Sequence, residues 1–157
     1  MTQVRRSRLR TAFPSVSASQ LTPIPIDDAA ASLSAILLDT AYYDFIVSGR
    51  KDANGLPWIG EDRLIPLKAF AWLDLSSRKA RGEPVDAKNI RKHANDVMRL
   101  AQLLAPETRI ILASGIADDL RRFLDGIKAD RSIGPASIKL NGSTADIAGR
   151  IALAYGL

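Results

Sequence analysis

The strongest pattern of apolar and polar residues lies between residues 62 and 104, where two apolar stretches flank a short polar turn. Residues 64–75 are apolar on almost every side of a helix, which is typical of a buried helix. Asp62 suits the N-cap of this helix, and Pro66 would then lie in its first turn, where the missing N–H costs little. We expect this helix to be the first arm of a hairpin.

The second arm is predicted to follow a turn at residues 82–85, with Asp86 as its N-cap. Apolar residues then recur at spacings of three and four, which forms a narrow seam suited to packing on the first arm. The seam consists of Ile90, Ala94, Val97, Ala101 and Leu104. The pattern therefore predicts an antiparallel helix hairpin over residues 62–104.

Shorter elements are expected on both sides of the hairpin. Before it we expect an extended piece at residues 21–26, a buried strand or a helix at 32–38, a helix at 41–48 capped by Asp39 or Thr40, and a strand at 56–59. After it we expect an extended piece at 109–113 and two helices capped by Ser114 and Ser143. The expected fold class is α+β, with few short N-terminal strands followed by a helical bundle built on the hairpin.

Length and charge favour one folded domain that carries a basic tail. The 157 residues suit a single domain, and four of the positive charges behind the net charge of +5 fall in the first ten residues. We expect residues 1–20 to be a disordered tail and residues 21–157 to form the domain. The arginine-rich end can contact phosphates, but a solvated terminus is its more ordinary explanation. RNA phosphates could also bind a cluster on the second arm of the hairpin, for which a charged outer face is the ordinary explanation: Lys88, Arg91, Lys92 and Arg99.

The composition argues against disulfides, against cysteine or histidine metal sites, and against a membrane or secreted location. The sequence has no cysteine, which excludes disulfides and thiolate sites, and its single histidine, His93, excludes a multi-histidine metal cluster within one chain. No apolar run approaches the ~20 residues that a membrane span needs, and the N-terminus lacks the apolar core of a signal peptide. We therefore expect a cytoplasmic protein without membrane association, and we identify no metal ligands.

The best candidates for chemistry are Lys68 and Asp96. The neighbours of Lys68 one helical turn away are all apolar, so its ammonium has to reach solvent, find a carboxylate or line a cleft. An antiparallel hairpin would place Asp96 at roughly 6 Å from Lys68 along the axis, from four residues at ~1.5 Å each. The two could then share one ligand. The alternative for Asp96 is an ordinary surface pair with Lys92, four residues earlier.

These residues also carry a resemblance to a known family. The segments are residues 33–38, Tyr42-Tyr43, residues 54–57, the hairpin from Leu64 to Leu104 with its Lys92-His93-Ala94-Asn95-Asp96 stretch, and the terminal Tyr155-Gly156. Together they resemble the C-terminal half of bacterial nucleotidyltransferase-like proteins of the AbiEii type, which belong to abortive-infection and toxin–antitoxin systems. The resemblance implies that Lys68 and Lys92 bind nucleotide and that Asp96 acts in transfer, with magnesium and a nucleoside triphosphate as cofactors.

The motifs that the family uses to hold magnesium and the triphosphate are missing from this sequence. The family's N-terminal half carries a glycine-serine pair followed by an Asp-x-Asp motif, whereas Gly142-Ser143 is followed by no such aspartates. We therefore expect a truncated or remnant member without independent transfer activity. The alternative is a helical protein-interaction module that binds an antitoxin-like protein or a second copy of itself.

Overall fold

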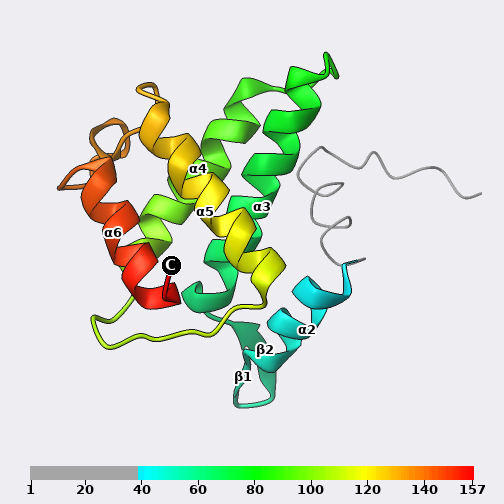
Figure 1. The fold of residues 1–157 in the computed structure, drawn as a ribbon. Helices are drawn as coiled ribbons and strands as arrows, with labels where there is room; N and C mark the ends of the chain where they lie inside the picture. The colour runs from blue at the N-terminus through cyan, green and yellow to red at the C-terminus, as the bar shows by residue number, and fades with distance from the viewer. Residues whose placement is uncertain (1–38) are drawn as a thin grey trace, which may run out of the picture.

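The structure is a computed structural model that describes residues 39–157. The expected tail at residues 1–20, the extended piece at 21–26 and the apolar run at 32–38 lie outside the described residues. The described part begins with one short helix and a β-hairpin and continues into a bundle of longer helices, as Figure 1 shows. The predicted fold class, α+β, is confirmed.

The first described elements are helix α2 (Thr40–Ser48) and a two-stranded antiparallel sheet of β1 (Arg50–Ala53) and β2 (Leu56–Ile59). Asp39 caps α2 by accepting hydrogen bonds from two backbone amides of its first turn, as one of the two predicted alternatives required. The strands are joined by Asn54 and Gly55, both at positive φ (56° and 80°), the conformation of a tight hairpin turn. Strand β1 was not predicted because its charged sequence has no apolar alternation.

The bundle is built on helices α3 (Glu61–Ala80) and α4 (Ala87–Ala101), which form the predicted antiparallel hairpin and lie side by side in Figure 1. Asp86 caps α4 through its carboxylate, which accepts a hydrogen bond from the amide of Lys88 at 2.8 Å. The prediction for the start of α3 was wrong. Its N-cap is Gly60, and Asp62 instead lies inside the first turn, 3.8 Å from Arg63 and 4.0 Å from Lys51.

The earlier start of α3 changes the position of Pro66, which is the sixth residue of the helix and not part of its first turn. A proline inside a helix has no N–H to donate to the carbonyl four residues earlier, here that of Asp62. The hydroxyl of Tyr155 donates a hydrogen bond to this carbonyl at 2.8 Å. The C-terminal helix therefore supplies the donor that Pro66 lacks, and Figure 1 shows the end of the chain beside the start of α3.

The remaining elements are helix α5 (Ser114–Ala129), a 3₁₀ turn η1 (Pro135–Ile138) and helix α6 (Thr144–Tyr155). Ser143 caps α6 as predicted, in a reciprocal capping box with Asp146. The predicted cap of α5 was wrong, because its N-cap is Ala113 and Ser114 is already helical. The expected extended piece at residues 109–113 forms no strand, but its Ile110 amide donates to the carbonyl of Ala154 at 2.8 Å.

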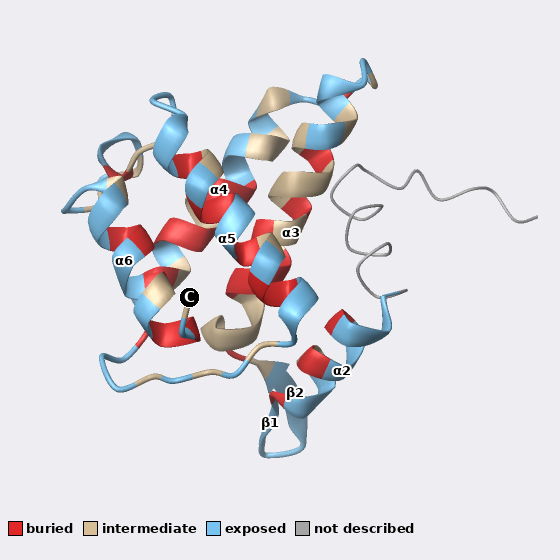
Figure 2. Cartoon of the chain, in the orientation of Figure 1, coloured by how far each residue is buried: buried red, intermediate tan, exposed pale blue. Residues whose placement is uncertain are grey.

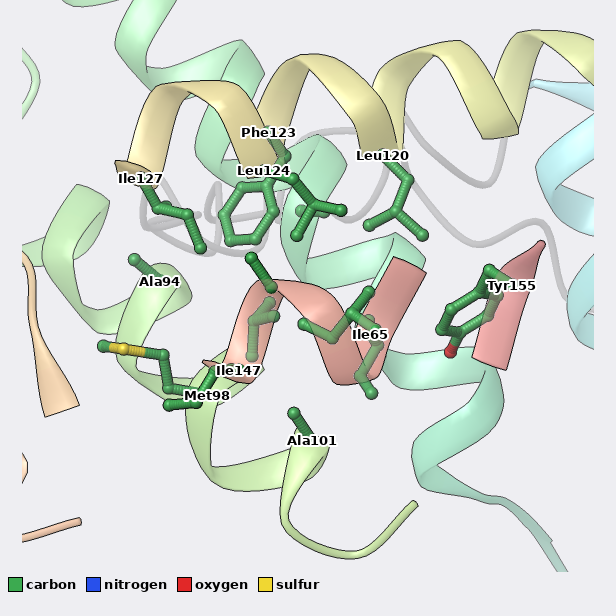
Figure 3. Packing of buried hydrophobic residues seen from close by; sticks show 14 of the residues in the cluster. Ile65, Ala94, Met98, Ala101, Leu120, Phe123, Leu124, Ile127, Ile147 and Tyr155 are labelled. Carbon is green, nitrogen blue, oxygen red and sulfur yellow. The ribbon is translucent and has the colours of Figure 1, made fainter. Parts of the chain in front are cut away.

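The main hydrophobic core lies between α3, α4, α5 and α6. Its largest fully buried side chains include Ile65 of α3, Met98 of α4, Phe123 of α5 and Ile151 of α6. Figure 2 shows the buried residues of these helices facing one another, and Figure 3 shows side chains of α5 directed toward those of α4 and α6. Each buried large side chain contributes about 1.5–3 kcal/mol to stability, so this core is what holds the bundle together.

A smaller core joins α2 to the bundle. Tyr42 and Phe45 of α2 pack against Leu67 and Ala71 of α3 and against Ile116 of α5. Neither tryptophan is fully buried in the core. The side chain of Trp72 is half-buried and packs on the main core, whereas Trp58 of β2 is 46% exposed.

Of the helices in residues 39–157, none has the length and apolar character needed to span a membrane.

Three of the described helices begin at a side-chain N-cap, formed by Asp39, Asp86 and Ser143, so local sequence sets where these helices start.

We predict that Tyr155→Phe lowers the free energy of unfolding by about 1–2 kcal/mol, because it leaves the partly buried carbonyl of Asp62 without a donor. Urea denaturation measures this loss. The control is Tyr43→Phe, since Tyr43 is 51% exposed and should lose almost nothing. Equal stability of the two variants would contradict the prediction.

The hydrogen bond from Tyr155 to the Asp62 carbonyl can also be tested by changing Pro66. Pro66→Ala restores a backbone N–H that reaches the carbonyl of Asp62, so Tyr155→Phe should cost less in the Pro66→Ala background than in the wild type. A double-mutant cycle on urea unfolding gives this difference directly. Additive effects would show that the two residues do not share the carbonyl.

Candidate functional site

The structure brings Lys68 of α3 and Asp96 of α4 into direct contact. The Lys68 Nζ lies 3.1 Å from Asp96 Oδ2, which is the distance of a hydrogen-bonded ion pair. The pair is half-buried, with 32% of the lysine side chain and 24% of the aspartate side chain exposed. The ammonium therefore remains open to solvent on one side.

Further cations surround the same carboxylate. The Arg99 guanidinium lies 3.7 Å from Asp96 Oδ1, one turn further along α4. Lys92 is exposed, and within residues 39–157 no ion pair joins it to Asp96. The surface pair of Lys92 with Asp96, which was the alternative from the sequence, is therefore not formed. Three cations and one carboxylate leave an excess of positive charge here.

The buried residue beside this pair is His93, whose side chain is 5% exposed. Neither ring nitrogen has a hydrogen-bond partner among the described residues. Burial lowers the pKa of His93 below its ordinary value of 6.5, and the positive charge of Lys68 lowers it further, while the Asp96 carboxylate acts in the opposite direction. The imidazole is consequently neutral at pH 7. It is a buried polar group whose two nitrogens are shielded from solvent.

We define these residues as the Lys68 cluster: Lys68, Lys92, His93, Asp96 and Arg99. The sequence indicated Lys68 and Asp96 as neighbours, whereas it assigned His93 no part in the site. Burial of His93 was not visible from the sequence because the residue falls between the apolar seam and the charged face of α4. The contact of Arg99 with Asp96, one turn away on the same helix, was likewise not predicted.

The donor set of the Lys68 cluster does not fit a magnesium ion. Mg²⁺ is held by oxygen ligands, commonly one or two carboxylates together with substrate phosphates. Asp96 is the one carboxylate of the cluster, and it is already paired with Lys68 and Arg99. Within residues 39–157 no group of three histidine, aspartate or glutamate side chains is arranged to hold a metal. The chemistry of the cluster is that of an anion-binding site.

Comparisons of the chain with models of protein families, with curated proteins and with solved structures find no match. The relationship to the AbiEii-type family therefore stays a prediction. The site has to be interpreted from the chemistry of its own residues.

We predict that His93 titrates below pH 6.5 and that Lys68→Met raises its pKa, because the variant removes a positive charge beside the ring. Asp96→Asn should lower the pKa of His93, since the carboxylate favours the charged imidazole. The measurement is proton NMR, in which the single histidine of the chain gives an unambiguous signal. An unchanged pKa of His93 in both variants would show that the ion pair does not affect the ring and would contradict the prediction.

The lowered pKa of His93 also has a consequence for stability. The unfolded chain binds a proton near pH 6.5, whereas the folded chain binds it only at lower pH, so the stabilising effect is present above about pH 6.5 and declines as the pH falls toward the folded pKa. In urea unfolding, His93→Leu should remove this part of the pH dependence. An exposed-residue control, Lys88→Ala, should leave it unchanged.

Proposed function

We propose that this chain is a nucleotidyltransferase-like protein that binds the phosphates of a nucleotide at the Lys68 cluster and does not catalyse transfer by itself. The observation that carries the proposal is the 3.1 Å ion pair between Lys68 and Asp96. Two residues that the family resemblance selects, far apart in the sequence and on different helices, are in contact.

The electrostatics of the cluster support an anionic ligand. A lysine ammonium has three donors, so Lys68 can keep its bond to Asp96 while donating to a phosphate oxygen from its exposed side. Arg99 and the exposed Lys92 add positive charge nearby. In this interpretation Asp96 holds the ammonium in position for the ligand. A role of Asp96 in catalysis would require a metal that these residues do not fit.

The test has two parts, binding and transfer. We expect ATP to bind the purified protein, as measured by calorimetry, and Lys68→Ala to weaken binding about tenfold because a charge-assisted hydrogen bond is lost. Lys88→Ala removes a charge of the same type from an exposed position of α4 and serves as the matched control. Equal losses of ATP affinity in the two variants would mean that only the net charge of the protein matters, and this result would overturn the proposal.

With labelled nucleoside triphosphates, magnesium and RNA or protein acceptors, we expect no incorporation by the chain alone. Incorporation that Asp96→Ala abolishes would contradict this expectation and would make the protein an active transferase. Binding without transfer is the result that the proposal requires.

A second candidate function is protein binding, with a second copy of the chain as the partner. One observation favours it: large apolar side chains gather on α2 and β2, where Val47 is 51% exposed, Trp58 46% and Leu56 72%. A groove of about 240 Å³ lies between these elements. Within residues 39–157 the sheet has two strands, so both of its edges could pair with another copy. An antitoxin-like protein is the other partner that the family resemblance implies.

We predict for this candidate that Val47→Glu reduces self-association in sedimentation velocity experiments run over a range of protein concentrations. Leu153→Glu is the matched control, because Leu153 is similarly exposed (59%) on α6. A wild-type protein that stays monomeric at high concentration would exclude the second copy as partner.

A further inference from the structure

A pocket separate from the Lys68 cluster lies where the turn end of the helix hairpin meets the segment after α5. Its volume is about 330 Å³, near the lower end of the range for small-molecule sites. The residues that line it include Trp72 and Lys79 of α3, Ile90 and Arg91 of α4, and Asp130, Ser132 and Ile133 after α5. None of these residues belongs to the Lys68 cluster.

The side chain of Trp72 is held rigidly at this pocket. Its ring meets Phe123 edge to face, with 5.4 Å between ring centroids and 86° between ring planes. On another side it contacts Gly126, where an added Cβ would come within 2.5 Å of the ring. The indole Nε1 is buried and has no hydrogen-bond acceptor among the described residues. Because this N–H is shielded from solvent, the part of Trp72 that lines the pocket is its apolar ring.

The charges that line the pocket are also open to a ligand. Lys79 and Arg91 form no ion pair within residues 39–157 and are both exposed. Asp130 uses Oδ1 for two hydrogen bonds, from the amide of Ser132 at 2.8 Å and from its hydroxyl at 2.7 Å. Its other carboxylate oxygen accepts no hydrogen bond from the described residues. The pocket therefore offers two cations and one carboxylate oxygen beside an apolar wall that includes the ring of Trp72.

We propose that this pocket binds a mononucleotide. The flat base would pack against Ile90, Ile133 and the edge of Trp72. The phosphate would lie between Lys79 and Arg91, whose guanidinium can form two parallel hydrogen bonds to it. The ribose hydroxyls would donate to Asp130. The volume accommodates one nucleotide and not a longer strand. This second site neither requires nor uses the Lys68 cluster.

The experiment uses Trp72 as its reporter. The chain has two tryptophans, so Trp58→Phe leaves Trp72 as the only one, and Trp58 lies on β2 outside the pocket. In this background we expect AMP to change the tryptophan fluorescence in a saturable way. Adenosine and ribose 5-phosphate should each bind at least tenfold more weakly, because each lacks one half of the ligand. Saturable binding of all three with equal affinity, or of none, would overturn the proposal.

Charge variants then locate the site. The double variant Lys79→Ala with Arg91→Ala should weaken AMP binding more than tenfold. The control Lys88→Ala with Arg131→Ala removes the same two residue types from exposed positions that do not line the pocket, and it should bind as the parent does. Lys68→Ala should also leave AMP binding at Trp72 unchanged, which separates this site from the proposed function. Equal weakening in the two double variants would overturn the assignment.

A short RNA with a 5′-terminal adenosine phosphate tests the source of the ligand. Tighter binding of free AMP supports a free mononucleotide, as proposed. Binding of the RNA with greater affinity than AMP would overturn the free mononucleotide and would show a strand end to be the source of the same chemistry. Thermal melting of each variant confirms that the variant is folded.

Discussion

The burial of helix α3 is the constraint on which the rest of the structure depends. This helix contacts α4 and α5 over most of its length, it carries residues of both hydrophobic cores, and its first turns meet the C-terminal end of α6. A helix that is apolar on almost every side has to be covered on almost every side. The other helices are arranged around that requirement, and the hydroxyl of Tyr155 meets the single backbone group that Pro66 leaves unpaired.

The burial of α3 also limits how the charged side chain of Lys68 can reach solvent. Lys68 lies between apolar neighbours, so its ammonium can reach solvent only along one direction, and that direction leads to Asp96 of α4. His93, on the adjacent turn of α4, is enclosed by the packing of the two helices and loses its access to water. The position of one buried helix thus sets the charge and hydration of the proposed site.

This arrangement produces two positively charged regions, the Lys68 cluster and the pocket at Trp72. They differ in whether a carboxylate pairs with their cations. In the Lys68 cluster one carboxylate pairs with two of the three cations, which favours a ligand that is mainly phosphate. At Trp72 an apolar wall and an indole accompany cations that have no partner, which favours a ligand with both a ring and a phosphate. The ligand proposed for each site therefore depends on whether the cations of that site already pair with a carboxylate.

The sequence by itself determined the features that depend on neighbouring residues. Caps at Asp86 and Ser143, the turn at Asn54-Gly55 and the apolar seam of α4 were predictable, because each requires only a few consecutive residues with defined side chains.

The tertiary structure decided the features that depend on distant residues. Strand β1 exists because β2 pairs with it, although its own sequence is charged. Pro66 is tolerated inside α3 because Tyr155, from the other end of the chain, donates to the freed carbonyl. The hairpin pattern predicted that Lys68 and Asp96 lie near each other, but their direct ion pair and the burial of His93 depend on how the two helices pack.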